Sequence, residues 1–391
     1  MNILYHFRTR GTGAEAVHIA GIAGAFEKLG HHVVFSSPTG VDPRLSAGSS
    51  PYQRSTNKSL AARLYVHCPN LIFELLEIGY NLVAWRKNRA ILKQSKISLI
   101  YERHALFLVS TSLLARKYNI PLIVEVNELV SDSRVRKQPW LGSLAAYFDK
   151  VLFRQAALIV VVSPHLKRRI EALGVSGNKV LILPNAVNEE FTRPADGSTI
   201  RARMGVSNEI VIGFIGWFVE WHRLDILLDV FSGLTETRSH LRLALVGEGP
   251  LRKSLEDQAR RLGIMDRIIF TGPLPYQEIP AAIAGMDICV VPHSNEYRSP
   301  IKMFEYMSQG KLVVAPATEP VTMVLRHREN ALLFKPGDTA SLATMLADAA
   351  DNAGLRRIAG LQAHQDVLDH HTWLRNAETV LANLRSEGNS L

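Results

Sequence analysis

The chain has 391 residues, of which 47% are hydrophobic and 21% charged, a composition that excludes disordered and fibrous proteins and, at this length, predicts two domains. The basic excess lies in the first half: residues 1–190 carry 24 Lys and Arg against 13 Asp and Glu, whereas residues 191–391 carry 21 against 23. We therefore expect an anionic partner for the first half, either a membrane surface or a phosphorylated acceptor. Nucleic acid ranks last, because no nucleic-acid-binding signature accompanies the charge.

The two cysteines, Cys68 and Cys289, have apolar neighbours and lack the spacing of metal ligands. This argues against a disulfide framework or a zinc site and fits a reducing cytoplasm. A strand-like run begins at Asn2, and no apolar stretch is long enough to span a bilayer. Neither a signal peptide nor a transmembrane segment is therefore predicted.

Continuous runs of Val, Ile and Leu alternate with helical patterns throughout the chain, as expected for parallel strands covered on both faces. Six runs in each half predict an α/β protein with two doubly wound, Rossmann-like domains. A linker is predicted near residues 185–198, where Pro and Gly interrupt the pattern. We place the domains at residues 1–190 and 191–368, followed by a last helical segment at 369–391. The predicted strands are 2–7, 32–37, 98–101, 121–126, 157–162, 180–183, 210–215, 241–246, 267–270, 287–291, 311–315 and 330–334.

The loop after the first strand reads Gly-Thr-Gly-Ala-Glu-Ala at residues 11–16, which matches a dinucleotide-binding fingerprint between a strand and a helix. Binding of NAD also requires an acidic residue at the end of the second strand, and that strand ends Phe-Ser-Ser-Pro at residues 35–38. NADP would favour a nearby arginine, and none follows before Arg44. An NAD-dependent oxidoreductase is thus the less favoured function, and a simple tight turn is the structural alternative.

Residues 71–85 predict a helix with a very wide apolar face, because Glu74, Glu77 and Asn81 recur at helical spacing among apolar residues. Two interpretations stay open: a buried helix with a solvated basic end, or an element that lies on a membrane surface and meets a lipid-linked acceptor. The basic cluster that follows consists of Arg86, Lys87, Arg89, Lys93 and Lys96.

Charged residues follow two strands of the first half, at residues 101–104 and 124–128. Loops at the carboxyl ends of parallel strands line the ligand crevice of such sheets. Arg103, Glu125 and Glu128 are therefore candidates for acceptor contacts, and a salt bridge within the loops is the alternative.

A helix is predicted to begin near residue 300, between two apolar runs. Ser299 suits the N-cap, Pro300 the first helical position and Gly310 the C-terminal cap. The start of a helix that follows a strand offers N–H groups to an anion such as a diphosphate. Lys302 and Glu305 would share one face, giving a cation for phosphate and a carboxylate for a ribose diol.

This segment resembles a motif of the retaining glycosyltransferases of family 4, which have the two-domain GT-B fold. The family motif has two Glu residues separated by seven positions; Glu305 takes the second, and Tyr297 stands at the first with Glu296 beside it. The resemblance implies that Glu305 binds the ribose hydroxyls and that Tyr297 or Glu296 lies at the donor sugar. It also implies that the last helical segment crosses back onto the first domain.

Residues 213–225 resemble a second family element, in which an Arg and a Lys contact the diphosphate. Trp217 and His222 take those two positions here. A departing diphosphate still requires neutralisation, and His222, Arg223 and Lys302 are the available cations. The structural alternatives are packing for Trp217 and a solvated loop position for His222. Asn127 stands where the family often has a His at the donor sugar, and it completes the catalytic set.

Further matches support the resemblance. Gly13 belongs to a Gly-rich first loop that faces the donor phosphates in the family, and residues 270–274 lie where backbone groups hold the base. The donor-binding residues that the resemblance implies are Gly13, Gly216, Trp217, Glu248, Leu274, Glu296, Tyr297, Ser299, Pro300, Ile301 and Glu305.

The chain has no D-x-D motif, which metal-dependent transferases generally carry, so we expect neither a catalytic metal nor another cofactor. The sequence thus predicts a cytoplasmic, retaining, metal-independent glycosyltransferase of hexosyltransferase class. Its partners would be a nucleotide-sugar donor, a glycan or lipid-linked acceptor, and the inner leaflet of the membrane through residues 71–96. Another GT-B enzyme, either a sugar-nucleotide epimerase or a phosphorylase, is the main alternative.

Overall fold

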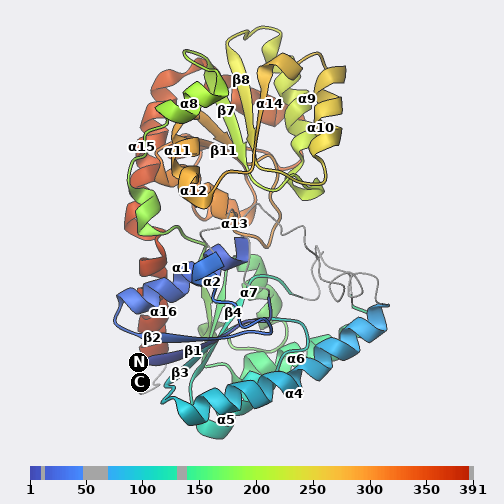
Figure 1. Cartoon of the computed structure of the whole chain (residues 1–391), viewed down its shortest axis with the longest axis vertical. Coiled ribbons are helices and arrows are strands. Elements are labelled where there is room, and N and C mark those ends of the chain that lie inside the picture. The colour runs from blue at the N-terminus through green and yellow to red at the C-terminus, as the bar shows by residue number, and fades with distance from the viewer. Residues whose placement is uncertain (10–13, 47–68, 130–138, 387–391) are drawn as a thin grey trace. The chain divides into compact units, whose positions relative to one another are not determined.

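The computed structural model describes residues 1–9, 14–46, 69–129 and 139–386 (Figure 1). The chain forms two compact units, and the change from one to the other falls at Pro184 and Asn185. The second unit is Asn185–Arg375, and the chain from Asn376 onward belongs to the first unit again. The units change six residues before the boundary predicted after residue 190 and seven residues after the one predicted after residue 368.

The first unit is built on a six-stranded parallel sheet with the order β2-β1-β3-β4-β5-β6. Its strands are β1 (Asn2–His6), β2 (His32–Ser36), β3 (Leu99–Arg103), β4 (Leu122–Val126), β5 (Leu158–Val161) and β6 (Val180–Ile182). Its helices are α1 (Ala14–Lys28), α2 (Pro43–Ser46), α4 (Asn70–Gln94), α5 (Ser110–Tyr118), α6 (Gly142–Gln155) and α7 (Pro164–Glu171), to which α16 (Trp373–Ser386) adds its residues from Asn376 on.

The second unit has a six-stranded parallel sheet with the order β12-β11-β10-β7-β8-β9. Its strands are β7 (Ile210–Ile215), β8 (Leu241–Val246), β9 (Ile268–Gly272), β10 (Ile288–Val290), β11 (Leu312–Pro316) and β12 (Ala331–Phe334). Its helices are α8 (Ser198–Met204), α9 (Leu224–Thr235), α10 (Arg252–Arg261), α11 (Ile279–Ala284), α12 (Ile301–Ser308), α13 (Glu319–Thr322), α14 (Thr339–Asp351) and α15 (Ala353–His370).

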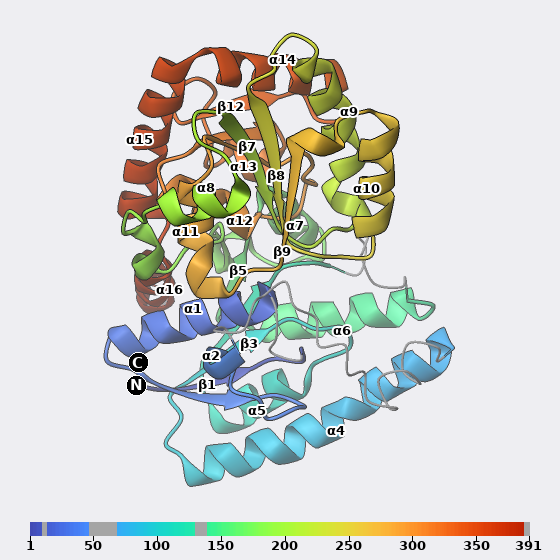
Figure 2. The same ribbon diagram turned by 45° about the horizontal axis from the view of Figure 1, so that its top comes forward.

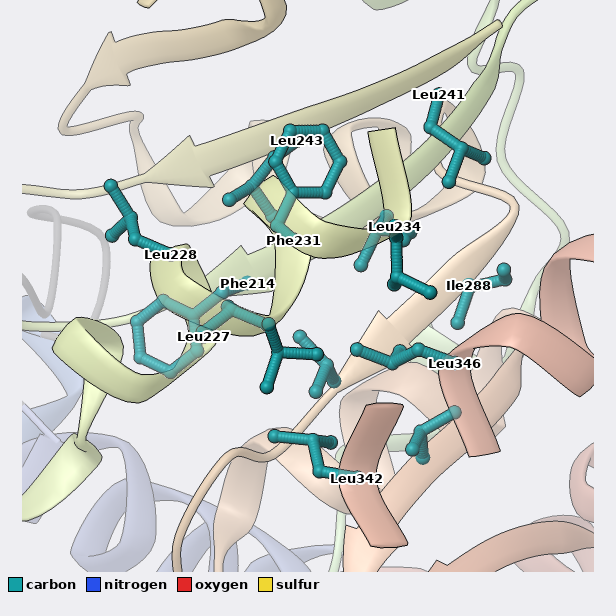
Figure 3. Packing of buried hydrophobic residues seen from close by; sticks show 14 of the residues in the cluster. Phe214, Leu227, Leu228, Phe231, Leu234, Leu241, Leu243, Ile288, Leu342 and Leu346 are labelled. Carbon is teal, nitrogen blue, oxygen red and sulfur yellow. The ribbon is translucent and has the colours of Figure 1, made fainter. Parts of the chain in front are cut away.

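The helices of the second unit cover both faces of its sheet. Figure 1 shows α9, α10 and α14 on one side of the sheet and α11, α12 and α15 on the other. Figure 3 shows the packing between α9, α14 and the strands, where Phe214, Leu227, Phe231 and Leu346 are fully buried. Burial of each such side chain contributes about 1.5–3 kcal/mol.

All of the predicted strands are confirmed, and so is the doubly wound α/β architecture. The continuous Val, Ile and Leu runs identified the strands because a parallel strand covered on both faces favours apolar side chains on both of them. The chain order reverses between β1 and β3 in the first sheet and between β7 and β10 in the second. Ligands of open α/β sheets bind beyond the carboxyl ends of the strands at such points, so we expect ligand-binding residues at both reversals.

The helix predicted over residues 71–85 is α4, and its apolar face is exposed rather than buried. Leu75 and Leu76 expose 55% and 54% of their surface, whereas Glu74 and Glu77 are buried. The buried-helix interpretation is therefore wrong, because the polar side chains of α4 find their partners inside the unit. Among the residues described above, no helix combines the length and apolar character that crossing a bilayer requires.

Candidate active site

The helix α12 follows β10 at the point of strand-order reversal and begins at Ile301. Pro300 occupies the N-cap position, so the helix begins one residue later than predicted. The predicted capping role of Ser299 is wrong, because its Oγ accepts the backbone N–H of Asn185 at 3.1 Å instead of a helical N–H. Gly310 has a φ of +64° just past the helix, so the predicted stop is confirmed.

Lys302 and Glu305 lie one turn apart on α12, and only 9% and 2% of their surfaces are exposed. Burial lowers the pKa of Lys302 to about 7 and raises that of Glu305 to about 7, and each charge partly offsets the shift of the other. Oε2 of Glu305 is buried and has no hydrogen-bond partner in the described part of the chain. Since a buried polar oxygen is unfavourable without a donor, this atom marks where a ligand hydroxyl would bind.

The ammonium of Lys302 is held between an aromatic ring and an imidazole. Nζ lies 3.9 Å from the ring centroid of Phe214 and 3.4 Å from Nε2 of His222. Burial and the charge of Lys302 hold the pKa of His222 well below its usual value, so this imidazole is neutral and accepts from the ammonium. His222 was predicted to supply a positive charge to the diphosphate; that role stays a prediction, and in the structure its ring contacts the ammonium of Lys302.

Two glycines let the loops after β7 and β8 approach each other beside Lys302. A Cβ on Gly216 would lie 2.7 Å from Nζ of Lys302, and one on Gly247 would lie 2.0 Å from the carbonyl oxygen of Gly216. Gly247 also has a φ of +135°, which side chains rarely allow. Both positions therefore require glycine for the ammonium and the β7 loop to fit.

Arg223 stands apart from this group. It caps α9 with a φ of +49°, and its guanidinium pairs with Asp225 at 3.0 Å on an exposed surface. Its role as a phosphate cation stays a prediction. A different arginine, Arg298, acts electrostatically on His222, and its guanidinium lies 5.3 Å from the ring centroid of Tyr297. Sequence reasoning missed Arg298, although its position directly after Tyr297 was a usable signal.

The remaining predicted donor residues differ in exposure. Tyr297 and Leu274 are buried, whereas Glu296 is exposed. Trp217, Ile301 and Glu248 are partly buried, and Glu248 accepts the backbone N–H of Gly249 through Oε1 at 3.0 Å. Tyr297, which stands at the first Glu position of the family motif, therefore lies inside the unit, whereas the neighbouring carboxylate of Glu296 is exposed. Gly13 lies outside the described residues.

Glu125 of the first unit is buried like Glu305, and it is fully engaged. It pairs with Arg103 at 2.5 Å and with Nε2 of His18 at 2.9 Å. Asn127 Nδ2 and the Tyr101 hydroxyl also donate to it, at 2.7 and 3.0 Å. Burial alone would raise its pKa, but His18 and Arg103 lower the pKa of Glu125 far below its usual value.

The structure thus joins three predicted residues, Arg103, Glu125 and Asn127, in one cluster. The alternative of a salt bridge is realised for Arg103 and Glu125, which face each other across β3 and β4. Glu128 follows β4 and is partly buried. His18 was not anticipated, because it comes from α1, far from the loops in sequence.

A histidine–glutamate pair lies at the point of strand-order reversal in the first sheet. His6 Nδ1 is 2.8 Å from Oε2 of Glu102, and Thr111 Oγ1 is 3.1 Å from the same nitrogen. The other carboxylate oxygen of Glu102 is buried and unpartnered in the described structure. His6 Nε2 is 3.4 Å from the hydroxyl of Tyr80, over whose ring the guanidinium of Arg8 lies. Sequence reasoning missed this pair, although His6 lies one residue before the end of a predicted strand and Glu102 lies one residue after the end of another.

The second-unit site offers a buried cation, a buried carboxylate with an unmet acceptor and a helix N-terminus on one element. That combination suits a nucleoside diphosphate, with phosphate at the ammonium and the helix start and a ribose diol at the carboxylate. Within the described ranges, His, Cys, Asp and Glu form no group that could hold a metal ion.

Two family models match the chain, one in each half. Residues 15–191 match "Glycosyltransferase Family 4" and residues 209–352 match "Glycosyl transferases group 1". The resemblance predicted from the sequence is therefore confirmed.

Among curated proteins, the chain is 26% identical to a 2-deoxystreptamine glucosyltransferase of Streptomyces kanamyceticus, over 54% of this chain and 55% of that protein. It is 28% identical to a D-inositol 3-phosphate glycosyltransferase of Stackebrandtia nassauensis, over 60% of this chain and 54% of that protein. The chain spans about half the length of these curated relatives.

Solved structures match over the whole chain. A glycosyltransferase from Rickettsia africae has a TM-score of 0.76 at 15% identity, covering 100% of this chain and 99% of that one. The Anabaena HepE protein, crystallised with UDP, has a TM-score of 0.72 at 18% identity, covering 99% of this chain and 100% of that one. At these identities the likeness establishes the fold, which is GT-B as predicted.

Proposed function

Because both units carry glycosyltransferase family domains on a GT-B fold, we propose that this chain transfers a sugar from a nucleoside-diphosphate sugar to an acceptor hydroxyl. The observation that carries the proposal is the unpartnered Oε2 of Glu305 beside the buried ammonium of Lys302. Glu305 accepts hydrogen bonds from the ribose hydroxyls, and Lys302 with the start of α12 neutralises the diphosphate. The complexes of HepE with UDP and with UDP-glucose support UDP as the first nucleotide to test.

The reaction proceeds with retention and without a metal. The acceptor oxygen attacks the anomeric carbon on the face from which the diphosphate departs, the bond from that carbon to phosphate oxygen breaks, and the leaving oxygen takes the acceptor proton. No separate nucleophile or base is needed, so the protein contributes positioning and stabilisation of the leaving charge. Lys302 stabilises that charge directly, and neutral His222 holds the ammonium in place.

The acceptor is a saccharide or a lipid-linked molecule of glycoconjugate assembly, met at the inner leaflet of the membrane. The basic excess of residues 1–190 supports an acceptor that carries phosphate. In the first unit, Arg103, Glu125 and Asn127 form a fixed polar cluster that would position acceptor or donor hydroxyls.

Thermal melting with UDP, GDP and NAD tests the donor class. A ligand at a hundredfold excess over Kd stabilises the folded state by about 2.7 kcal/mol, which melting resolves easily. We expect a rise in Tm with UDP or GDP and none with NAD. Release of nucleoside diphosphate from a panel of nucleotide sugars, unchanged by EDTA, then tests the metal-independent transfer. A shift with NAD alone would contradict the proposal and favour an oxidoreductase.

A further inference from the structure

The helix α4, the long outer helix of the first unit in Figures 1 and 2, carries its apolar side chains on the outside. These residues come in three pairs, of which the second follows the first by about one turn and the third follows the second by about two turns, so they form one stripe along the helix. Each exposes between 41% and 56% of its surface. The stripe, called the leucine stripe below, consists of Leu71, Ile72, Leu75, Leu76, Leu82 and Val83.

The orientation of α4 is fixed by its polar side chains, which point into the unit. Glu74 accepts the backbone N–H groups of Trp140 and Leu141 at 2.6 and 2.8 Å. Asn81 accepts from two backbone N–H groups at the start of α5 and donates to the carbonyl of Phe107 at 2.7 Å. Turning α4 to bury the leucines would leave these groups unpaired. The exposure of the stripe is therefore built into the fold.

Further exposed apolar side chains lie at residue 140 and on the following helix α6. Trp140 exposes 70% of its surface, Tyr147 62% and Leu144 38%. The backbone of Trp140 is bonded to Glu74 of α4, so this group is tied to the stripe. Trp and Tyr are the side chains that favour the boundary between lipid headgroups and acyl chains.

The charged residues around the leucine stripe indicate which kind of partner it binds. On the C-terminal half of α4, Arg86, Arg89 and Lys93 are exposed, whereas the acidic residues of the helix, Glu74 and Glu77, are both buried. The exposed face of α4 thus carries apolar side chains, and its charged side chains are all basic. A second copy of the chain would bring two basic faces together, whereas an anionic lipid surface complements both the apolar and the basic part.

We propose that the leucine stripe, with Trp140, Leu144 and Tyr147, docks this protein on an anionic lipid surface: the apolar side chains enter the acyl boundary and the basic residues of α4 meet the headgroups. The inference deepens the proposed function, because docking would bring the enzyme to a lipid-linked acceptor. It is measured without any sugar transfer, so its failure and that of the proposed function are distinguishable.

Co-sedimentation with vesicles tests the proposal. The full chain is mixed with vesicles of phosphatidylglycerol or of phosphatidylcholine, at low and at high salt. We expect binding to the anionic vesicles, weakened by salt, and a blue shift of tryptophan emission that is reduced in Trp140→Phe. Leu75→Ser/Leu76→Ser should weaken vesicle binding at least tenfold, and Arg86→Ser/Arg89→Ser should remove the preference for anionic vesicles.

Matched controls come from the second unit. Ile358 and Leu361 on α15 are each 59% exposed, so Ile358→Ser/Leu361→Ser removes as much exposed apolar surface elsewhere and should bind like the parent. Lys253→Ser/Arg357→Ser is the control for charge. All variants should keep the parental Tm and its shift with nucleotide, because the substituted side chains lie on the surface.

Three outcomes would overturn the proposal. The parent does not bind phosphatidylglycerol vesicles at low salt; or the stripe variant binds as the parent does; or sedimentation velocity shows a dimer that Leu75→Ser/Leu76→Ser dissociates, in which case the stripe joins two copies of the chain.

Discussion

Two glutamates, Glu125 in the first unit and Glu305 in the second, are each about 2% exposed and yet lie in opposite electrostatic states. Glu125 is met by Arg103, His18, Asn127 and a tyrosine, and its pKa is far below normal. Burial raises the pKa of Glu305 to about 7, and one of its oxygens lacks a partner. The comparison teaches that burial alone does not mark a binding group. A buried carboxylate oxygen without a hydrogen-bond donor indicates a binding position for a ligand, whereas a carboxylate whose oxygens accept hydrogen bonds from the protein has a structural role.

The largest expected effect concerns the satisfied glutamate. Arg103→Met would leave Glu125 charged and buried without its arginine partner, and removing one partner of a buried pair costs about 3–5 kcal/mol. Urea unfolding measures the loss, with Arg223→Met as control because Arg223 pairs with Asp225 on the surface. A loss below about 1 kcal/mol, as for a surface pair, would contradict the assignment of Glu125 as scaffold.

The next effect concerns turnover. Lys302→Met should lower kcat more than it raises KM, because charge on the leaving diphosphate grows in the transition state. Loss of one such contact lowers kcat by about 10²–10³-fold. Arg223→Met should lower kcat less, since its guanidinium is engaged by Asp225. Steady-state kinetics with the active nucleotide sugar checks both, and a Lys302→Met enzyme with parental kcat would remove Lys302 from the phosphate site.

Neutralising each glutamate sharpens the comparison further. Glu125→Gln replaces an acceptor of several charge-assisted hydrogen bonds and should destabilise the fold by about 1.5–3 kcal/mol. Glu305→Gln removes an unmet charge and should change stability by less than about 1 kcal/mol in the absence of nucleotide. Parallel urea unfolding of the two variants is the measurement. Equal losses would mean that both glutamates are structural.

The smallest effect is the dependence of stability on pH. For Glu305, whose folded pKa is raised to about 7, the folded state holds the extra proton, so its contribution falls as pH rises from about 4.5 to 7. For Lys302, whose folded pKa is lowered to about 7, the unfolded state holds the extra proton above pH 7, so stability rises again toward pH 10.5. The pair thus gives a dip in stability near neutral pH that Lys302→Met/Glu305→Gln should lack. A dip that persists in the double variant belongs to other groups.

The sequence predicted the strands and the placement of Lys302 and Glu305 well, because both depend on local pattern. Continuous apolar runs identify buried strands, and residues three apart on a helix share a face. The capping of α12 was mispredicted because Ser299 is engaged by Asn185, 114 residues away along the chain. Local preference does not reveal such a distant partner.

Long-range partners also explain what the sequence left open or missed. The apolar pattern of α4 fits a buried and an exposed helix equally well, and the contacts of Glu74 and Asn81 decide between them. The cluster around Glu125 draws His18 from another element, and the neutrality of His222 depends on Lys302 nearby. None of these pairings is visible as a motif.

Calorimetric titration with UDP tests the central claim most directly. Glu305→Ala removes the acceptor for the ribose hydroxyls and should weaken binding by about 1.5–3 kcal/mol, roughly ten- to a hundredfold in Kd, with Tm unchanged in the absence of nucleotide. Glu296→Ala removes an exposed carboxylate of the loop that precedes α12 and should leave UDP affinity at the parental value. A Kd for folded Glu305→Ala equal to that of the parent would contradict the account.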